Sequence, residues 1–144
     1  QTALLQQLVF RILWSQWFVK QLSPFLILTE GYINMVKIIN AATLATWLNS
    51  GECLLIDVRE VDEYAAGHIR GANLCPLSTF HQSFNLETAP QYKKLVFQCR
   101  SGKRSDTACH IVAELHPEHD GIYNLEGGIM AWMAAGLPIV LQDA

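Results

Sequence analysis

One stretch decides the fold of this 144-residue chain, and it reads Leu95-Val96-Phe97-Gln98-Cys99-Arg100-Ser101-Gly102-Lys103-Arg104-Ser105. Its first four residues form an apolar run that is typical of a short buried strand. A helical pattern follows from about Arg104 to Leu115, so Cys99 lies where a strand gives way to a helix. Because a helix N-terminus and nearby cations both favour a thiolate, we predict that Cys99 is a nucleophile that acts on an anion. The alternative is a cysteine that only ends a buried strand.

The loop after Cys99 has the composition of an anion-binding site. Arg100, Lys103 and Arg104 supply positive charge in a chain whose formal net charge is −3. Free amides at the start of the helix can cradle an oxyanion or a polysulfur group. This spacing fits sulfur transfer from a thiosulfate-like anion, and it also admits attack on phosphorus.

The composition limits the class of protein. With 51% hydrophobic and 16% charged residues, the chain is globular and long enough for one domain with a core. The acidic balance gives no reason to expect nucleic-acid binding. The four cysteines lack CxxC and zinc-finger spacing, so we expect no metal site. An active thiol must stay free, which favours a reducing compartment and a cytoplasmic location.

Residues 1–34 differ from the rest of the chain. They are rich in large apolar residues and read as an amphipathic helix that breaks before Pro24. Arg11 and Lys20 interrupt them, so no uncharged stretch approaches the roughly 20 residues of a membrane-spanning helix. Four interpretations stay open: packing on the domain, association into a homo-oligomer, attachment to a membrane surface, or an extension not native to the functional unit.

Residues 35–144 alternate short strands with amphipathic helices. That alternation predicts an α/β fold with a parallel sheet covered on both faces, and ligands then bind at the carboxyl ends of the strands. The predicted strands are 54–57, 72–74, 95–98 and 122–125, and the predicted helices are 40–50, 60–66, 104–115 and 129–135, with a helical turn in 77–84. The inward faces are expected to hold Val61, Tyr64 and Ala65, then Ala108, Ile111, Val112 and Leu115, then Ile129, Trp132 and Met133.

Other polar and thiol residues have mainly structural interpretations. Asp57 and Arg59 are close enough in sequence to pair or to orient loops near the active edge. His68 lies between a glycine and a strand, where an imidazole usually satisfies backbone groups, although a general base is the alternative. Cys109 follows Ser105 by four residues in the helix, and a buried small residue is a simpler account of it than a resolving thiol. Gly127-Gly128 lacks phosphate-loop spacing, so close packing of a helix explains it better.

Three motifs together resemble the rhodanese domain family over about Met35 to Val140. They are Leu55-Ile56-Asp57-Val58-Arg59 through Glu63-Tyr64 to Gly67-His68-Ile69-Arg70-Gly71-Ala72, the Cys99 loop, and Leu125-Glu126-Gly127-Gly128-Ile129-Met130-Ala131-Trp132 followed by Gly136-Leu137-Pro138. The resemblance implies a five-stranded parallel sheet flanked by helices, and a Cys99 that becomes a persulfide. It also implies a donor site lined by Arg100, Ser101, Gly102, Lys103 and Arg104, with support from Arg59 and Asp57.

The leading hypothesis is a sulfurtransferase that moves sulfane sulfur from thiosulfate or a similar donor to a thiophilic acceptor, with cyanide as the acceptor in vitro and no cofactor. A cysteine-dependent phosphatase or arsenate reductase is one alternative. Phosphatases of this fold have a longer loop with an arginine six residues after the cysteine, whereas Arg104 follows Cys99 by five. A non-catalytic interaction module is the other. Some bacterial relatives carry a transmembrane hairpin after this domain, so a fragment of a longer membrane protein stays open.

Overall fold

The computed structural model describes residues 36–88, 92 and 94–142, all within the unit Met35–Ala144. The expectations for residues 1–34 lie outside these described residues. Within the described part of the chain, no helix combines the length and the apolar character needed to cross a bilayer.

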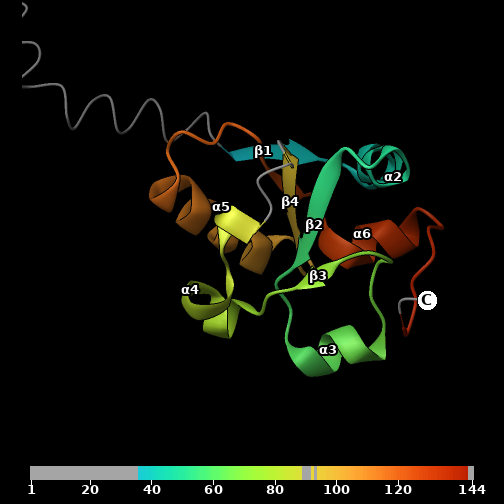
Figure 1. Cartoon of the computed structure of the whole chain (residues 1–144). Coiled ribbons are helices and arrows are strands. Elements are labelled where there is room, and N and C mark those ends of the chain that lie inside the picture. The colour runs from blue at the N-terminus through green and yellow to red at the C-terminus, as the bar shows by residue number, and fades with distance from the viewer. Residues whose placement is uncertain (1–35, 89–91, 93, 143–144) are drawn as a thin grey trace, which may run out of the picture. The chain divides into compact units, whose positions relative to one another are not determined.

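The core of the unit is one sheet of five parallel strands in the order β1-β5-β4-β2-β3 (Figure 1). This confirms the α/β class and the five-stranded parallel sheet. The central strand is β4, which pairs with β2 on one side and β5 on the other. The strands are β1 (Val36–Ile39), β2 (Cys53–Asp57), β3 (Asn73–Leu74), β4 (Lys94–Gln98) and β5 (Ile122–Leu125).

The first strand, β1, is the one that the residue pattern had not identified. It lies at the edge of the sheet and pairs only with β5 among the described strands, from Val36 opposite Ile122 to Ile39 opposite Leu125. Lys37 interrupts its apolar residues and Ile39 alone of the four is buried, so β1 lacks the uninterrupted buried run of the central strand β4. Its pairing with β5, rather than its own hydrophobic pattern, defines it as a strand.

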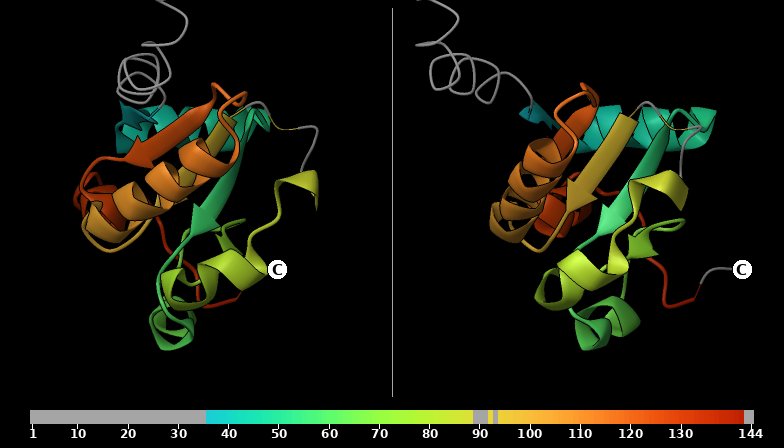
Figure 2. Two further views of the ribbon diagram at one scale, coloured as in Figure 1. Left: turned by 90° about the vertical axis from the view of Figure 1, so that its left-hand side faces the viewer. Right: turned by 60° about the vertical axis from the view of Figure 1, so that its left-hand side comes forward.

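Helices cover both faces of the sheet, as predicted (Figures 1 and 2). On one face Phe80 and Val112 pack in a core with Phe97 of β4. On the other face Leu44 and Trp132 pack in a second core. The helices are α2 (Ala41–Ser50), α3 (Val61–Ala66), α4 (Phe80–Ser83), α5 (Lys103–Leu115) and α6 (Gly128–Ala134), with 3-10 turns η1 (Leu77–Thr79) and η2 (Leu86–Thr88).

Three predicted inward faces are partly wrong. Val61 is 64% exposed and Ala65 is exposed, because only the Tyr64 side of the six-residue helix α3 packs against the second core; Tyr64 is half-buried there, as predicted. Leu115 is exposed at the last position of α5, and Met133 is exposed near the end of α6. In α5 the fully buried Cys109 takes part in the core, as the structural interpretation of that thiol expected.

Candidate active site

Cys99 directly follows the carboxyl end of β4, where the sequence places it. Its side chain belongs to the core on the α5 face, and only 1% of the residue is exposed. The chain then turns through Arg100 and Ser101, both exposed, before α5 begins at Lys103. A buried thiol thus lies at the base of an exposed loop on the central strand.

The sulfur of Cys99 is surrounded by hydrogen-bond donors from its own loop. The Gly102 N–H donates to Sγ at 3.1 Å, and the Ser105 hydroxyl lies 3.4 Å from it. Burial raises the pKa of this thiol, but hydrogen bonds from the Ser105 hydroxyl and from the N–H groups of Ser105, Gly102 and Ser101 outweigh burial. The net result is a pKa below the ordinary value, which favours the thiolate.

Gly102 is the residue that allows this turn. It has φ +98°, in the left-handed region that side chains rarely adopt, and it precedes the first residue of α5. A Cβ atom there would also lie 3.4 Å from the Leu125 carbonyl oxygen and 3.5 Å from the Gly127 nitrogen. The local conformation of Gly102 therefore aims its N–H at the sulfur while α5 starts one residue later.

Asn124, on β5, is a residue of the site that the sequence reasoning missed. Its side-chain amide donates to the Gly102 carbonyl oxygen at 3.0 Å, and its Oδ1 accepts from the Ser105 hydroxyl at 2.7 Å. Asn124 and Ser105 are both buried. A lone polar residue within an apolar strand was the only signal, and its two partners lie 22 and 19 residues away in the sequence.

The start of α6 packs on the other side of the loop. The N–H groups of Ile129 and Met130 donate to the carbonyl oxygens of Cys99 and Arg100, at 2.8 and 3.2 Å. A Cβ atom on Gly128 would lie 2.3 Å from the Cys99 carbonyl oxygen. Close packing does explain the glycine pair: Gly128 lies against the backbone of the cysteine loop, and a Cβ atom on Gly127 would meet Ala131 of α6 at 2.7 Å.

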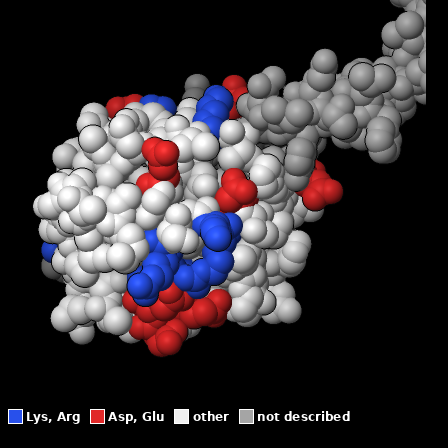
Figure 3. Space-filling view, turned by 180° about the vertical axis from the view of Figure 1, so that it is seen from behind, with Lys and Arg blue, Asp and Glu red and all other residues white. Residues whose placement is uncertain are grey.

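The three cations of the loop do not share one role. Both guanidinium amines of Arg104 donate to the Glu63 carboxylate of α3, at 2.7 and 2.8 Å. Arg104 lowers the pKa of Glu63 to about 2. Arg100 and Lys103 are exposed, and no ion pair is found for either among the described residues. On the face turned away from Figure 1, basic side chains gather beside acidic ones (Figure 3).

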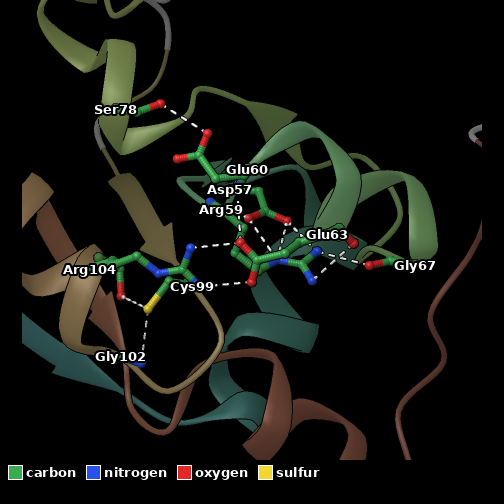
Figure 4. A network of polar contacts seen from close by, with 10 residues as sticks. Asp57, Arg59, Glu60, Glu63, Gly67, Ser78, Cys99, Gly102 and Arg104 are labelled. Atoms are coloured by element: carbon green, nitrogen blue, oxygen red, sulfur yellow. Dashed lines mark hydrogen bonds and ion pairs between the residues drawn. The ribbon is translucent and has the colours of Figure 1, made fainter.

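Asp57 and Arg59 form a buried ion pair next to α3. The Arg59 guanidinium donates to Asp57 Oδ2 at 2.7 Å, and also to the carbonyl oxygens of Gly67 at 2.9 Å and Glu63 at 3.4 Å. Neither residue contacts the sulfur directly in Figure 4; they hold the helix that carries the Glu63 carboxylate. That figure shows the loop group and the α3 group joined across the site, namely Cys99, Gly102 and Arg104 with Asp57, Arg59 and Glu63.

The remaining thiols and His68 lie apart from this chemistry. All four cysteines are free and buried, and burial raises the pKa of Cys53, to about 11, and those of Cys75 and Cys109. The His68 ring stacks on Tyr64 at 3.7 Å between centroids, and its Nδ1 lies 3.0 Å from the Tyr64 carbonyl oxygen. Among the described residues, no group of three or more His, Cys, Asp or Glu is arranged to hold a metal ion.

The protein is a parallel α/β domain whose central strand leads into a cysteine in an amide-lined loop. This arrangement defines a class of domains that transfer a group by way of a cysteine. The chain belongs to the rhodanese-like domain family, whose model matches residues 40–135. It is 35% identical over 110 residues to a protein of Allochromatium vinosum named sulfurtransferase, which covers 76% of this chain and 99% of that protein.

Solved structures show the same fold. A rhodanese-related protein from Thermoplasma volcanium is 32% identical with a TM-score of 0.60, over 74% of this chain and 99% of that one. A thiosulfate sulfurtransferase from Pseudomonas aeruginosa is 31% identical with a TM-score of 0.60. That match covers 75% of this chain and 19% of the longer protein, so this domain corresponds to one part of it.

Proposed function

We propose that this protein is a sulfurtransferase that takes sulfane sulfur from thiosulfate, or a similar anion, and carries it as a persulfide on Cys99. The observation that supports it most is the set of N–H and O–H donors around a thiol whose pKa they lower. Those donors fit an anionic sulfur, both in the thiolate and in the persulfide. The sulfurtransferase names of relatives more than 30% identical support the same reaction class.

The first step loads the cysteine. The Cys99 thiolate attacks the outer sulfur of thiosulfate, a new S–S bond forms at Sγ, and the S–S bond of thiosulfate breaks. The electron pair of that bond leaves with sulfite, so the charge is conserved. Arg100 and Lys103, with exposed charges at the loop, would hold the dianion and stabilise the departing sulfite.

The second step removes the outer sulfur from the Cys99 persulfide. A thiophilic acceptor, with cyanide as the acceptor in vitro, attacks the outer sulfur of the persulfide, and the Cys99 thiolate is the leaving group. The hydrogen bonds to Sγ favour this departure because they stabilise the anion that forms. The two steps balance in atoms and electrons without a cofactor.

Two features weigh against the phosphatase alternative. Arg104 follows Cys99 by five residues, which makes a tighter loop than a tetrahedral phosphate needs. The guanidinium that a phosphate would require is already engaged by both oxygens of the Glu63 carboxylate. Freeing Arg104 for a phosphate would leave Glu63 without its ion-pair partner.

The experiment is intact mass spectrometry of the reduced protein before and after thiosulfate. We expect a gain of one sulfur, about 32 Da, that cyanide removes. Cys99→Ser should gain nothing, whereas Cys75→Ser, a change at a buried thiol outside the site, should behave as wild type. No adduct on the wild-type protein, or an adduct on Cys99→Ser, would overturn the proposal. Cys99-dependent hydrolysis of an aryl phosphate would then favour a phosphatase.

A further inference from the structure

The side chain of Asn124 joins two separate parts of the cysteine loop. It comes from β5, the strand next to β4, and it is 7% exposed. It contacts Gly102, the residue whose N–H faces the sulfur, and Ser105, in the first turn of α5. Both partners of Asn124 are therefore also neighbours of Cys99.

Donor and acceptor rules fix the orientation of the Asn124 amide. The Gly102 carbonyl oxygen can only accept, so the NH2 group of Asn124 must face it. Oδ1 then faces Ser105, whose hydroxyl has a single proton to donate. That proton has two acceptors within reach, Asn124 Oδ1 at 2.7 Å and the sulfur at 3.4 Å. In this arrangement the hydroxyl proton is shared between two acceptors, whereas the Gly102 N–H donates to the sulfur at 3.1 Å, beside the N–H groups of Ser101 and Ser105.

We propose that Asn124 is a positioning residue of the active-site loop: by holding the Gly102 carbonyl, it keeps the Gly102 N–H aimed at the Cys99 sulfur. The glycine most needs such an anchor, since its backbone is freer than that of any other residue. The inference rests on the proposed role of Cys99 as the nucleophile. Asn124 itself contacts no reacting atom, so its effect passes through Gly102.

Other ionisable groups near the Cys99 thiol also influence its charge, and the test must leave them unchanged. Arg104 and Cys109, both on α5, interact electrostatically with Cys99. Asp57, the last residue of β2, is paired with Arg59, which follows the strand by two residues. None of these side chains bonds to Asn124 in the described structure. A change at Asn124 should therefore alter the thiol through the loop and leave these charges in place.

The test measures how fast iodoacetamide alkylates Cys99 as a function of pH, by mass spectrometry of the peptide that contains it. Asn124→Ala should move the profile to higher pH and slow alkylation at pH 7 by about two- to tenfold, as expected for one lost hydrogen bond to the thiolate. Ser105→Ala is the matched variant, because it removes the hydroxyl and keeps the bond from Asn124 to Gly102.

The double variant separates the two routes. If Asn124 acts through Gly102, then Asn124→Ala slows alkylation further when Ser105 is already alanine. If it has no effect in that background, Asn124 acts only by orienting the hydroxyl, and the proposal is wrong. A profile unchanged in both backgrounds would also refute it.

Two further measurements keep the test decisive. Should Asn124→Ala fail to fold, Asn124→Leu in the Ser105→Ala background, compared with Ser105→Ala alone, keeps the size and the neutral charge of the side chain but cannot donate to Gly102. An unchanged alkylation profile in that variant would overturn the proposal, and a profile at higher pH would support it. Alkylation needs no sulfur donor, so a wild-type protein that forms no persulfide would refute the sulfurtransferase function while this test still reports on Asn124.

Discussion

Glu63 of α3 and Arg104 of α5 are 41 residues apart in the sequence, yet both oxygens of the carboxylate accept from the guanidinium, at 2.7 and 2.8 Å. The contact ties the helix after β2 to the helix after β4. It also engages one of the three loop cations within the protein itself. Arg100 and Lys103 are then the cations of the loop that face solvent with their charge available to an anion.

Removing the Glu63 carboxylate should make the free energy of unfolding less sensitive to pH in the acidic range. The pKa of Glu63 is lowered from 4.5 to about 2 by Arg104, so its contribution is present above about pH 4.5 and is lost as the pH falls towards 2. Glu63→Gln should be less stable than wild type by about 0.5–1 kcal/mol at pH 6. Urea unfolding at pH 6 and pH 3 should show the difference shrinking. Glu87→Gln, at an exposed position of η2, is the control.

Removing one partner of the buried Asp57–Arg59 ion pair should strongly lower the free energy of unfolding. Arg59→Ala leaves the fully buried Asp57 carboxylate without its guanidinium, a loss of about 3–5 kcal/mol in the free energy of unfolding. Adding Asp57→Ala should recover part of that loss, because the uncompensated charge is gone. Urea unfolding of the single and double variants measures it, and strictly additive effects would contradict this account.

Gly128→Ala should damage the site more than its conformational strain explains. Its φ is +59° and the new Cβ atom would meet the Cys99 carbonyl oxygen at 2.3 Å, whereas Gly136, at φ +74°, has nothing within 4 Å. Gly136→Ala should cost about 1–2 kcal/mol of stability, from strain alone. Gly128→Ala should cost more and reduce sulfur transfer, which unfolding curves and thiosulfate turnover can compare. Equal losses in the two variants would show that the close contact is unimportant.

Neutralising the exposed loop cations should weaken donor binding. Arg100→Gln and Lys103→Gln should each raise the KM for thiosulfate about three- to tenfold, and the effect should shrink at high salt. Lys37→Gln, on β1, is the matched control and should leave KM unchanged. Steady-state kinetics at low and high ionic strength provide the measurement. A rise in KM of the same size for Lys37→Gln would indicate a general effect of net charge.

The sequence predicted the elements that local patterns determine. Asn40 accepts from the Thr43 N–H and caps the start of α2, and Gly51 ends it with a φ of 68°, in agreement with the helix predicted over 40–50. The apolar run before Cys99 predicted β4, and the alternation of elements predicted the parallel sheet. In each case the cause lies within a few neighbouring residues, which a single sequence displays.

What the sequence did not reveal depends on contacts between distant elements. The strand β1 is defined by pairing with β5, and the roles of Glu63 and Asn124 arise only when α3 and β5 meet the cysteine loop. Val61 shows the converse error: an apolar residue at a helical position was expected inside, but Tyr64 is the α3 side chain that packs against the core, and Val61 is 64% exposed. Periodicity describes a face of a helix and not what covers it.

The central place of β4 has a consequence for how motion is distributed around the thiol. Strands paired on both sides open last when a protein breathes, so the backbone that carries Cys99 should show the slow amide exchange of the most protected part of the domain. The exposed side chains of Arg100 and Ser101, which follow it, can rearrange without breaking the backbone hydrogen bonds that hold the loop. If the sulfur is held in place by the strand, the exposed side chains around it can differ in sequence, and therefore in the substrates they admit. The position of the sulfur would not change.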